Sequence, residues 1–280
     1  MILEPLRRFF LILTIESIRK NSSTLVQSTI YMHPKPIIET HELFKKFGRK
    51  HTPATNGVSL KIYEGQVVGL IGPNSSGKTT LQRMLATVLK PTSGTIKYHG
   101  RIVRNGRNKD RLRRNIGYVP QGDCLYGDLT IEENLLLFSE PYGIKKRTRK
   151  HRIEALLHQL HLTERRDYLV RNLSGGMAKR ASIAAALVHN PKIVFMDEVT
   201  MGLDPTSRLE IWNLIRELKQ SGVTIIMTTH YLNEVQSLCD KTFILSKGKL
   251  VEDDTPRALL DKYHTDDLDD VIQKVIKKEA

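Results

Sequence analysis

Five short stretches of the chain carry the hydrophobic pattern of β-strands. Four of them, at residues 66–72, 193–196, 224–228 and 243–245, are almost continuously apolar, which is typical of strands buried on both faces. The fifth, at residues 58–62, alternates apolar and polar side chains and predicts a half-buried strand. Because continuously apolar strands occur mainly in parallel sheets covered by helices, the pattern predicts an α/β protein with a mainly parallel sheet.

Apolar residues at helical spacing separate these strands. The first predicted helix is marked by apolar residues that recur every three or four positions: Leu81, Met84, Leu85, Val88 and Leu89. A Pro-Thr-Ser-Gly stretch at residues 91–94 predicts the end of this helix. Further helices are predicted at residues 208–220 and 231–238, and two short ones within residues 255–280.

A helix-rich stretch at residues 131–169 lies between the first two core strands. Its apolar periodicity rests on four residues: Ile153, Leu156, Leu157 and Leu160. Residues 145–152 of the same stretch are dense in charge. We expect a helical subdomain at about residues 122–172, inserted into the sheet domain.

The first 36 residues differ from the rest and are predicted to be a basic, partly apolar extension that ends at Pro34 and Pro36. Their apolar run at residues 9–13 falls far short of the ~20 residues that a membrane span needs. Two preceding arginines give a faint likeness to a secretory signal, but no small-residue cleavage site follows. A flexible or amphipathic extension is favoured, or sequence that precedes a start at Met32.

The composition is that of an ordinary globular protein with an excess of positive charge. Of 280 residues, 40% are hydrophobic and 26% are charged, which excludes a disordered chain. The net charge of +14 predicts a polyanionic partner: a nucleotide, a nucleic acid or an anionic membrane face. The two cysteines, Cys124 and Cys239, stand in no metal or redox spacing and fit a reducing compartment.

A phosphate-binding loop follows the first apolar strand. Residues 72–79 match the pattern G-x-x-x-x-G-K-[ST] at every fixed position, between a strand and a helix, where that motif works. Its glycines let backbone N–H groups surround phosphate oxygens, Lys78 adds a charge, and the Thr79 hydroxyl suits Mg²⁺. The residues expected to bind the nucleotide here are Gly72, Pro73, Asn74, Ser75, Ser76, Gly77, Lys78, Thr79 and Thr80.

Two adjacent acids, Asp197 and Glu198, end the second apolar strand. A carboxylate at this place can hold magnesium directly or through water, and we assign that role to Asp197. Its neighbour Glu198 can polarise the attacking water. A pair of solvated loop acids is the alternative, and we would favour it only in a chain without a phosphate loop.

A second glycine-rich helix start occurs at Ser174, Gly175 and Gly176, before an alanine-rich helix at residues 178–188. It could be a plain N-cap with flexible glycines, or another phosphate site. Two phosphate-binding helix starts in one chain are most simply explained if two copies face each other and each completes the other's site. We therefore expect Ser174, Gly175 and Gly176 to contact nucleotide.

With these motifs in order, residues 37–262 resemble the ATP-binding subunit of an ABC transporter. The resemblance implies a P-loop NTPase core of ABC type, with a small antiparallel β-subdomain, the inserted helical subdomain and a helical tail at residues 263–280. It implies ATP and Mg²⁺ as cofactors. Further roles follow from the same resemblance: magnesium contact for Gln121, contact with the opposite protomer for Asp204, γ-phosphate binding for His230, and adenine stacking for Phe47.

Three sequence features are closest to ATPases of the ABC-2 export type: Leu-Ser-Gly-Gly-Met at residues 173–177, Thr-Thr-His-Tyr-Leu-Asn-Glu-Val at 228–235, and the acidic stretch 267–271. This implies an ABC-2 type membrane permease as partner, export as the direction, and the cytoplasmic face of the membrane as location. It also implies pairing, either with a second copy or with a homologous ATPase.

Three residues depart from the family pattern: Ser75 in place of glycine, Val199 in place of proline, and Met201 in place of a small residue. None removes a reacting group, so hydrolysis is expected to survive. The changes at Val199 and Met201 could alter how two protomers meet or how fast they separate.

Two other classes of protein are alternatives to the transporter subunit. A nucleic-acid-directed ABC ATPase typically has two ATPase domains or long coiled coils, and this chain shows neither. Its basic runs at residues 101–114 and 145–152 lack the interleaved aromatic residues that stack bases, so no nucleic acid is expected. These runs are either solvated faces or contacts to anionic lipid headgroups. A nucleotide-binding regulator would lack the catalytic carboxylate, whereas Glu198 is present.

Overall fold

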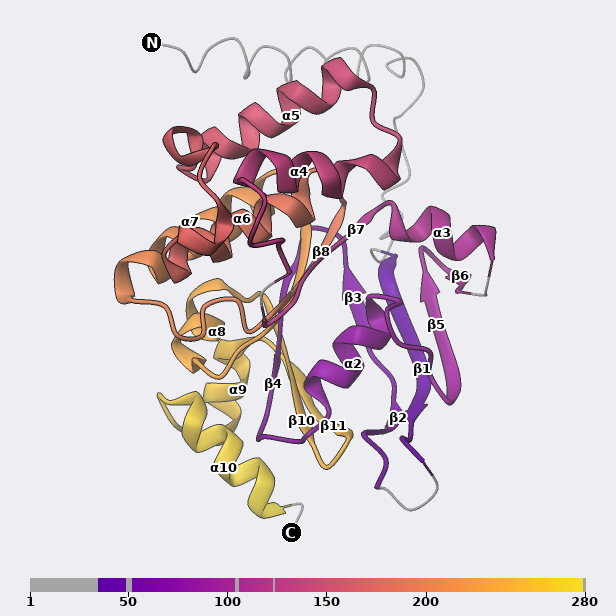
Figure 1. Ribbon diagram of the computed structural model, residues 1–280. Helices are drawn as coiled ribbons and strands as arrows, with labels where there is room; N and C mark the ends of the chain where they lie inside the picture. The colour runs from indigo at the N-terminus through magenta and orange to yellow at the C-terminus, as the bar shows by residue number, and fades with distance from the viewer. Residues whose placement is uncertain (1–34, 49–51, 104–105, 123, 279–280) are drawn as a thin grey trace, which may run out of the picture. The chain divides into compact units, whose positions relative to one another are not determined.

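The computed structural model describes residues 35–48, 52–103, 106–122 and 124–278. The expectations for the extension at residues 1–34 therefore lie outside the described residues. Within the described part, no helix combines the length and the apolar character that crossing a bilayer requires. Figure 1 shows the arrangement of the elements along the chain.

A six-stranded sheet forms the core, in the order β11-β10-β4-β9-β8-β7. Its strands are β4 (Val67–Ile71), β7 (Ile116–Val119), β8 (Ile193–Asp197), β9 (Thr224–Thr228), β10 (Lys241–Ser246) and β11 (Lys249–Asp254). Every pair is parallel except β10 with β11. The predicted parallel sheet is confirmed. Because the five parallel strands run the same way, their carboxyl ends share one edge.

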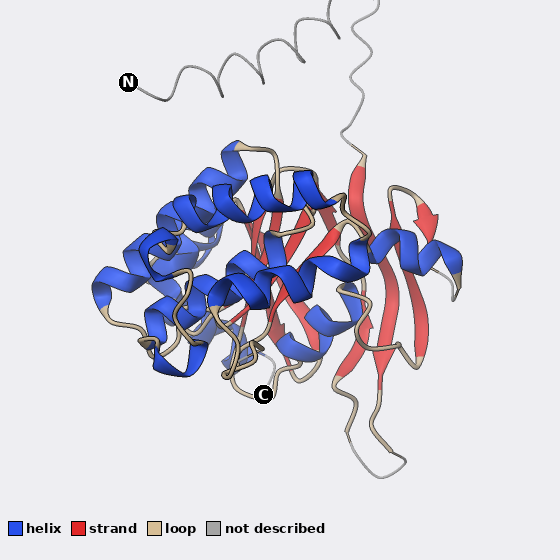
Figure 2. Cartoon of the chain, turned by 45° about the horizontal axis from the view of Figure 1, so that its top comes forward, coloured by secondary structure: helices blue, strands red, loops and turns tan. Residues whose placement is uncertain are grey.

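A second, antiparallel sheet consists of β1 (Pro36–Lys45), β2 (Thr55–Val58), β3 (Lys61–Tyr63), β5 (Ser93–Tyr98) and β6 (Arg101–Ile102). It stands beside α2 (Lys78–Leu85) in Figures 1 and 2. The single strand expected at residues 58–62 is wrong, because β2 and β3 are separate. Thr40 of β1 divides them: its hydroxyl donates to the Val58 carbonyl at 3.0 Å and accepts from the Leu60 N–H at 3.0 Å.

The remaining helices are α3 (Arg107–Arg113), α4 (Ile131–Ser139), α5 (Lys146–Gln159), α6 (Gly175–Leu187), α7 (Pro205–Gln220), α8 (Leu232–Leu238), α9 (Pro256–Tyr263) and α10 (Leu268–Lys278). Helix α2 ends at Leu85, four residues before the predicted end. Thr87 adopts a left-handed conformation (φ 59°), and Arg113 donates to its carbonyl at 2.9 Å. Val88 is consequently 58% exposed instead of packing on the helix face.

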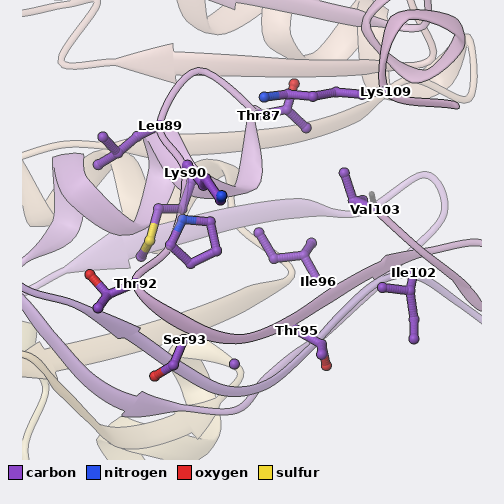
Figure 3. Close-up of a pocket in the computed structure, with 13 residues that line it drawn as sticks. Thr87, Leu89, Lys90, Thr92, Ser93, Thr95, Ile96, Ile102, Val103 and Lys109 are labelled. Carbon is purple, nitrogen blue, oxygen red and sulfur yellow. The ribbon is translucent and has the colours of Figure 1, made fainter. Parts of the chain in front are cut away.

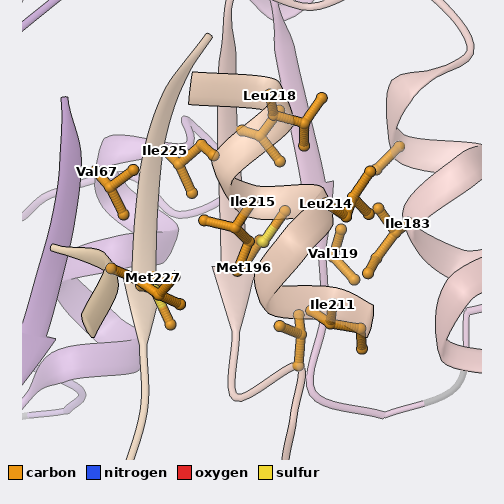
Figure 4. Close-up of a cluster of buried hydrophobic side chains, with 14 of the residues drawn as sticks. Val67, Val119, Ile183, Met196, Ile211, Leu214, Ile215, Leu218, Ile225 and Met227 are labelled. Carbon is orange, nitrogen blue, oxygen red and sulfur yellow. The ribbon is translucent and has the colours of Figure 1, made fainter. Parts of the chain in front are cut away.

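Side chains on alternate positions of each parallel strand enter different cores. Val194 and Met196 of β8 join the cluster that includes α7, whereas Phe195 joins the cluster that includes α2. Figure 4 shows the first cluster, in which Ile211 and Leu214 of α7 and their neighbours pack toward β8 and β9. The sheet is covered on both faces, which explains why its strands read as continuous apolar runs.

The predicted helical stretch at residues 131–169 contains α4, α5 and two short 3₁₀ turns, η1 (Glu140–Tyr142) and η2 (Thr163–Arg165). Thr130 and Glu133 form a reciprocal capping box at the start of α4. Buried Asn134 ties the preceding loop to this helix. Its amide oxygen accepts from the Tyr126 N–H at 2.8 Å, and its amide nitrogen donates to the Tyr126 and Thr130 carbonyls at 3.0 and 2.9 Å.

We expect Asn134→Ala to lower the free energy of unfolding by about 2 kcal/mol, because it removes the hydrogen bonds by which a buried amide holds the backbone of Tyr126. Urea denaturation followed by circular dichroism measures this. The matched control on the same helix is Leu137→Ala, whose side chain is partly exposed and which should change stability by less than about 0.5 kcal/mol. Equal effects of the two substitutions would contradict the role given to Asn134.

Candidate active site

The phosphate-binding loop joins the carboxyl end of β4 to the first turn of α2, which contains Thr79 and Thr80. Gly72 has φ 139°, and a Cβ there would meet the Leu245 carbonyl oxygen at 2.1 Å, so this position requires glycine. Ser75 is left-handed as well (φ 62°), which explains why a glycine is usual at its place. Buried Ser76 keeps its hydroxyl without a hydrogen-bond partner, a donor that a phosphate oxygen would satisfy.

Lys78 lies inside this loop rather than in solvent. Its ammonium group donates to the carbonyl oxygens of Gly72 at 2.9 Å and Pro73 at 3.0 Å. Burial lowers the pKa of Lys78, and the nearby carboxylates of Glu198 and Asp197 act in the opposite direction. The cation is therefore held in the loop, facing both acids.

Asp197 is fully buried at the carboxyl end of β8. One carboxylate oxygen accepts from the Thr228 hydroxyl at 2.7 Å and from the Thr79 hydroxyl at 3.3 Å, and the other accepts from Tyr118 at 3.3 Å. Burial raises the pKa of Tyr118, which keeps the phenol a donor. A carboxylate and a hydroxyl oxygen side by side are donors that suit Mg²⁺, so Thr79 and Asp197 fit that ion.

Glu198 is the point where three loops meet. One of its carboxylate oxygens lies 2.9 Å from Nε2 of His230, and the other accepts from the Gln121 amide at 3.0 Å. Its backbone is left-handed (φ 49°), and its N–H donates to both the carbonyl and the hydroxyl of Thr228 at 3.1 Å. Such a conformation in a non-glycine residue is strained and is maintained by these bonds.

Gln121, which we expect to contact magnesium, donates its amide hydrogen to the Glu198 carboxylate in this structure. The same nitrogen lies 3.7 Å from the sulfur of Met201, whose side chain is exposed. Met201 is one of the three residues that depart from the family pattern. The other departure, Val199, is buried in the core cluster with α7. An effect of Val199 on a second protomer would consequently be indirect.

Ser174, Gly175 and Gly176 lie at the start of α6, which packs against α4, α5 and α7, whereas α2 packs on β8 and β9. The Ser174 hydroxyl caps the helix by accepting from the Met177 N–H at 3.3 Å, and Ser174 and Gly175 are exposed. A Cβ on Gly176 would meet the Ser207 hydroxyl at 2.5 Å, so glycine lets α7 approach. This second helix start therefore presents an exposed surface away from α2.

Two other expected site residues are also exposed. Asp204 caps α7 by accepting from the Ser207 N–H at 3.0 Å, and bonds from Ser207 lower the pKa of its carboxyl. Phe47, just beyond β1, is 48% exposed and has the Lys45 ammonium 5.1 Å from its ring centre. An exposed aromatic face can stack on a base, and this remains a prediction for Phe47.

Sequence reasoning missed Thr228, which binds Asp197 and the Glu198 backbone together. The sequence shows only that Thr228 ends the strand predicted at residues 224–228. No local pattern reveals that this strand pairs with β8, which places Thr228 opposite Asp197. The cleft of about 320 Å³ in Figure 3 is lined by residues such as Thr87, Lys90, Ile96 and Lys109, and it contains none of the residues expected to bind nucleotide.

A phosphate loop, a buried aspartate and a glutamate held by a histidine on one edge of a parallel sheet define a nucleoside triphosphatase. The family model described as ABC transporter matches residues 55–201, and the chain belongs to this family. It is an ATP-binding subunit that hydrolyses ATP. The ATP-binding subunits of such transporters pair with one another and with membrane permease subunits.

Curated relatives agree with this assignment. The Nod factor export ATP-binding protein I of Ralstonia nicotianae is 37% identical over 225 residues, which are 80% of this chain and 69% of the relative. The linearmycin resistance ATP-binding protein LnrL of Bacillus subtilis is 35% identical over 215 residues, 77% of this chain and 68% of the relative. The first is named for export and the second for antibiotic resistance, and the nucleic-acid alternative finds no support among them.

Solved structures agree as well. An ATP-binding subunit of an ABC transporter superposes with a TM-score of 0.76 at 26% identity, covering 86% of this chain and 99% of the other. The ATP-binding cassette MJ0796, solved as a dimer in a post-hydrolysis state with ADP and phosphate, gives a TM-score of 0.71 at 28% identity, with 78% and 98% covered. The expected ABC-type ATPase core is therefore confirmed.

We expect Lys78→Ala to weaken ATP binding by about 100-fold, because it removes the buried cation of the loop. Titration with a fluorescent ATP analogue measures the Kd. Lys90→Ala, at the cleft of Figure 3, is the matched control and should leave the Kd unchanged. Equal affinity in the two variants would remove Lys78 from the phosphate site.

Proposed function

We propose that this chain energises export through a separate ABC-2 type permease, as a peripheral subunit at the cytoplasmic face of the membrane. Two ATP-binding subunits, either two copies or this chain and a homologous ATPase, enclose two ATP molecules. Each ATP binds one subunit's phosphate loop and the other subunit's Ser174, Gly175 and Gly176. The exposed helix start of α6, and Asp204 at the start of nearby α7, support this arrangement because both are available to a second subunit.

The observation that carries the proposal is the meeting of Gln121, Glu198 and His230 beside the phosphate loop. Glu198 orients the attacking water and accepts its proton, and His230 holds the γ-phosphate. Thr79, Asp197 and Gln121 would hold magnesium, which would supply positive charge to the phosphate oxygens. Lys78 does the same from inside the loop.

The resting bonds of Glu198 imply a switch between two arrangements. His230 and Gln121 each engage one oxygen of its carboxylate, so both oxygens are bound to side chains of the same subunit. If His230 turned to the γ-phosphate and Gln121 to a bound magnesium ion, the Glu198 carboxylate would be released to act as the general base. Hydrolysis is then restricted to the closed, nucleotide-loaded pair, which avoids turnover by the isolated subunit.

Glu198→Gln should reduce steady-state ATP hydrolysis at least about 100-fold, because an amide cannot take the proton of water. The ATP Kd should stay within error of the unmodified chain. Phosphate release and nucleotide titration check the two quantities, with Glu154→Gln on exposed α5 as the control that should behave normally. Normal turnover by Glu198→Gln would refute its role as the base.

A groove beside the site suits the membrane partner. Its volume is about 460 Å³, and its lining joins Tyr118 and Pro120 at the end of β7 to Phe138 of α4, with Cys124 between them. Tyr118 bonds Asp197, so the groove touches the site and the helical subdomain at once. We assign this groove to a cytoplasmic segment of the permease. The relatives' roles in Nod factor export and linearmycin resistance favour outward transport.

Cys124 gives a direct test of this docking surface. Cys124 is partly exposed, whereas Cys239 is buried, and burial raises the pKa of the Cys239 thiol. A bulky maleimide should therefore react at Cys124 alone and block the groove. We expect labelled protein to lose its association with permease-containing membranes, measured by co-sedimentation, while its ATP affinity is unchanged.

The control is Cys124→Ser treated with the same reagent, which should still associate with the membranes. Undiminished association of the labelled chain would place the permease on another surface.

A further inference from the structure

Glu234 of α8 is a fully buried carboxylate that the hydrolysis steps above do not use. One of its oxygens accepts from the indole N–H of Trp212 on α7 at 3.1 Å. The other accepts from the Thr229 hydroxyl at 2.6 Å. A buried carboxylate is costly unless hydrogen-bonded, so these two donors fix its position and Glu234 fixes theirs.

Thr229 connects this carboxylate to the histidine loop. Its hydroxyl donates to Glu234 and accepts from the Tyr231 N–H at 3.0 Å, so this second bond closes a short turn of the chain around His230. The residue between, His230, lies 2.9 Å from Glu198. The backbone on either side of His230 is therefore tied, through the Thr229 hydroxyl, to the buried carboxylate of Glu234.

Helix α7 contacts the histidine loop a second time. The Arg208 guanidinium lies 3.9 Å from the ring centre of Tyr231, one helical turn before Trp212. The adjacent face of α7 is buried in the core through Ile211 and Leu214, and Trp212 packs against the same cluster. Its first residue follows Asp204, which is exposed where we place the second subunit.

We infer that Glu234 is a positioning residue for His230, and that the Trp212–Glu234–Thr229 bonds couple α7 to the histidine loop. A displacement at Asp204 on contact with a second subunit reaches His230 through α7 and these two hydrogen bonds. The coupling rests on the proposed role of His230, and it adds a route by which one subunit senses the other.

The test compares Glu234→Gln with the pair Thr229→Val and Thr229→Ser. Glutamine has a single acceptor oxygen, whereas the two donors each use a different oxygen of Glu234. Valine removes the Thr229 hydroxyl at nearly constant shape, and serine keeps it. We expect kcat to fall about tenfold in Glu234→Gln and Thr229→Val, with the KM for ATP within about twofold, and Thr229→Ser to restore turnover. Circular dichroism verifies that each variant is folded.

Trp212 is the single tryptophan of the chain, so its fluorescence reports on the coupling independently of turnover. ATP should shift the emission of the unsubstituted chain and of Thr229→Ser, and the shift should be absent in Thr229→Val. Normal kcat in Thr229→Val, or an unchanged fluorescence response, would overturn the inference. A loss of hydrolysis in the unsubstituted chain would instead refute the proposed function.

Discussion

The parallel pairing of β4, β8 and β9 is the constraint on which the rest of the molecule depends. Because these neighbouring strands run the same way, the loops after Ile71, Asp197 and Thr228 leave the sheet at one edge. Lys78 of the first connection therefore lies near the carboxylates of Asp197 and Glu198 at the second. The pairing of the strands, and not the sequence of the loops, brings these groups together. Helix α2 completes the arrangement, since buried Gln82 donates to the carbonyls of Met196 and Ile226 at 2.9 and 3.2 Å.

Strain is concentrated at this edge and balanced by bonds around it. Ser75 and Glu198 are both left-handed, a conformation that costs an L-residue about 1–2 kcal/mol. The N–H of Glu198 reaches two acceptors on Thr228, and the Thr228 hydroxyl in turn bonds Asp197. One threonine therefore supports the strained glutamate and orients the neighbouring aspartate. The arrangement places two adjacent acids in different surroundings, with Asp197 among hydroxyl groups and Glu198 against Gln121 and His230.

Much of this was predictable from sequence where the information is local. The phosphate loop, the two acids at the end of β8 and the parallel sheet follow from spacing and apolar runs. The predictions failed where residues distant in sequence determine the local structure. Helix α2 stops at Leu85 because Arg113 binds Thr87 and Tyr98 donates to the Leu85 carbonyl. The buried carboxylate of Glu234 was likewise invisible, because its partners lie 22 and 5 residues away on separate elements.

The bonds from Lys78 to the carbonyls of Gly72 and Pro73 have a thermodynamic consequence. The loop keeps its curvature through its own contacts, so ligand binding exchanges one set of acceptors for another instead of ordering a coil. Little conformational entropy is lost in that exchange, and a released product leaves behind a loop ready for the next nucleotide. An ATPase binds and releases nucleotide in every cycle, and a preformed phosphate-binding loop favours fast nucleotide exchange over very high affinity.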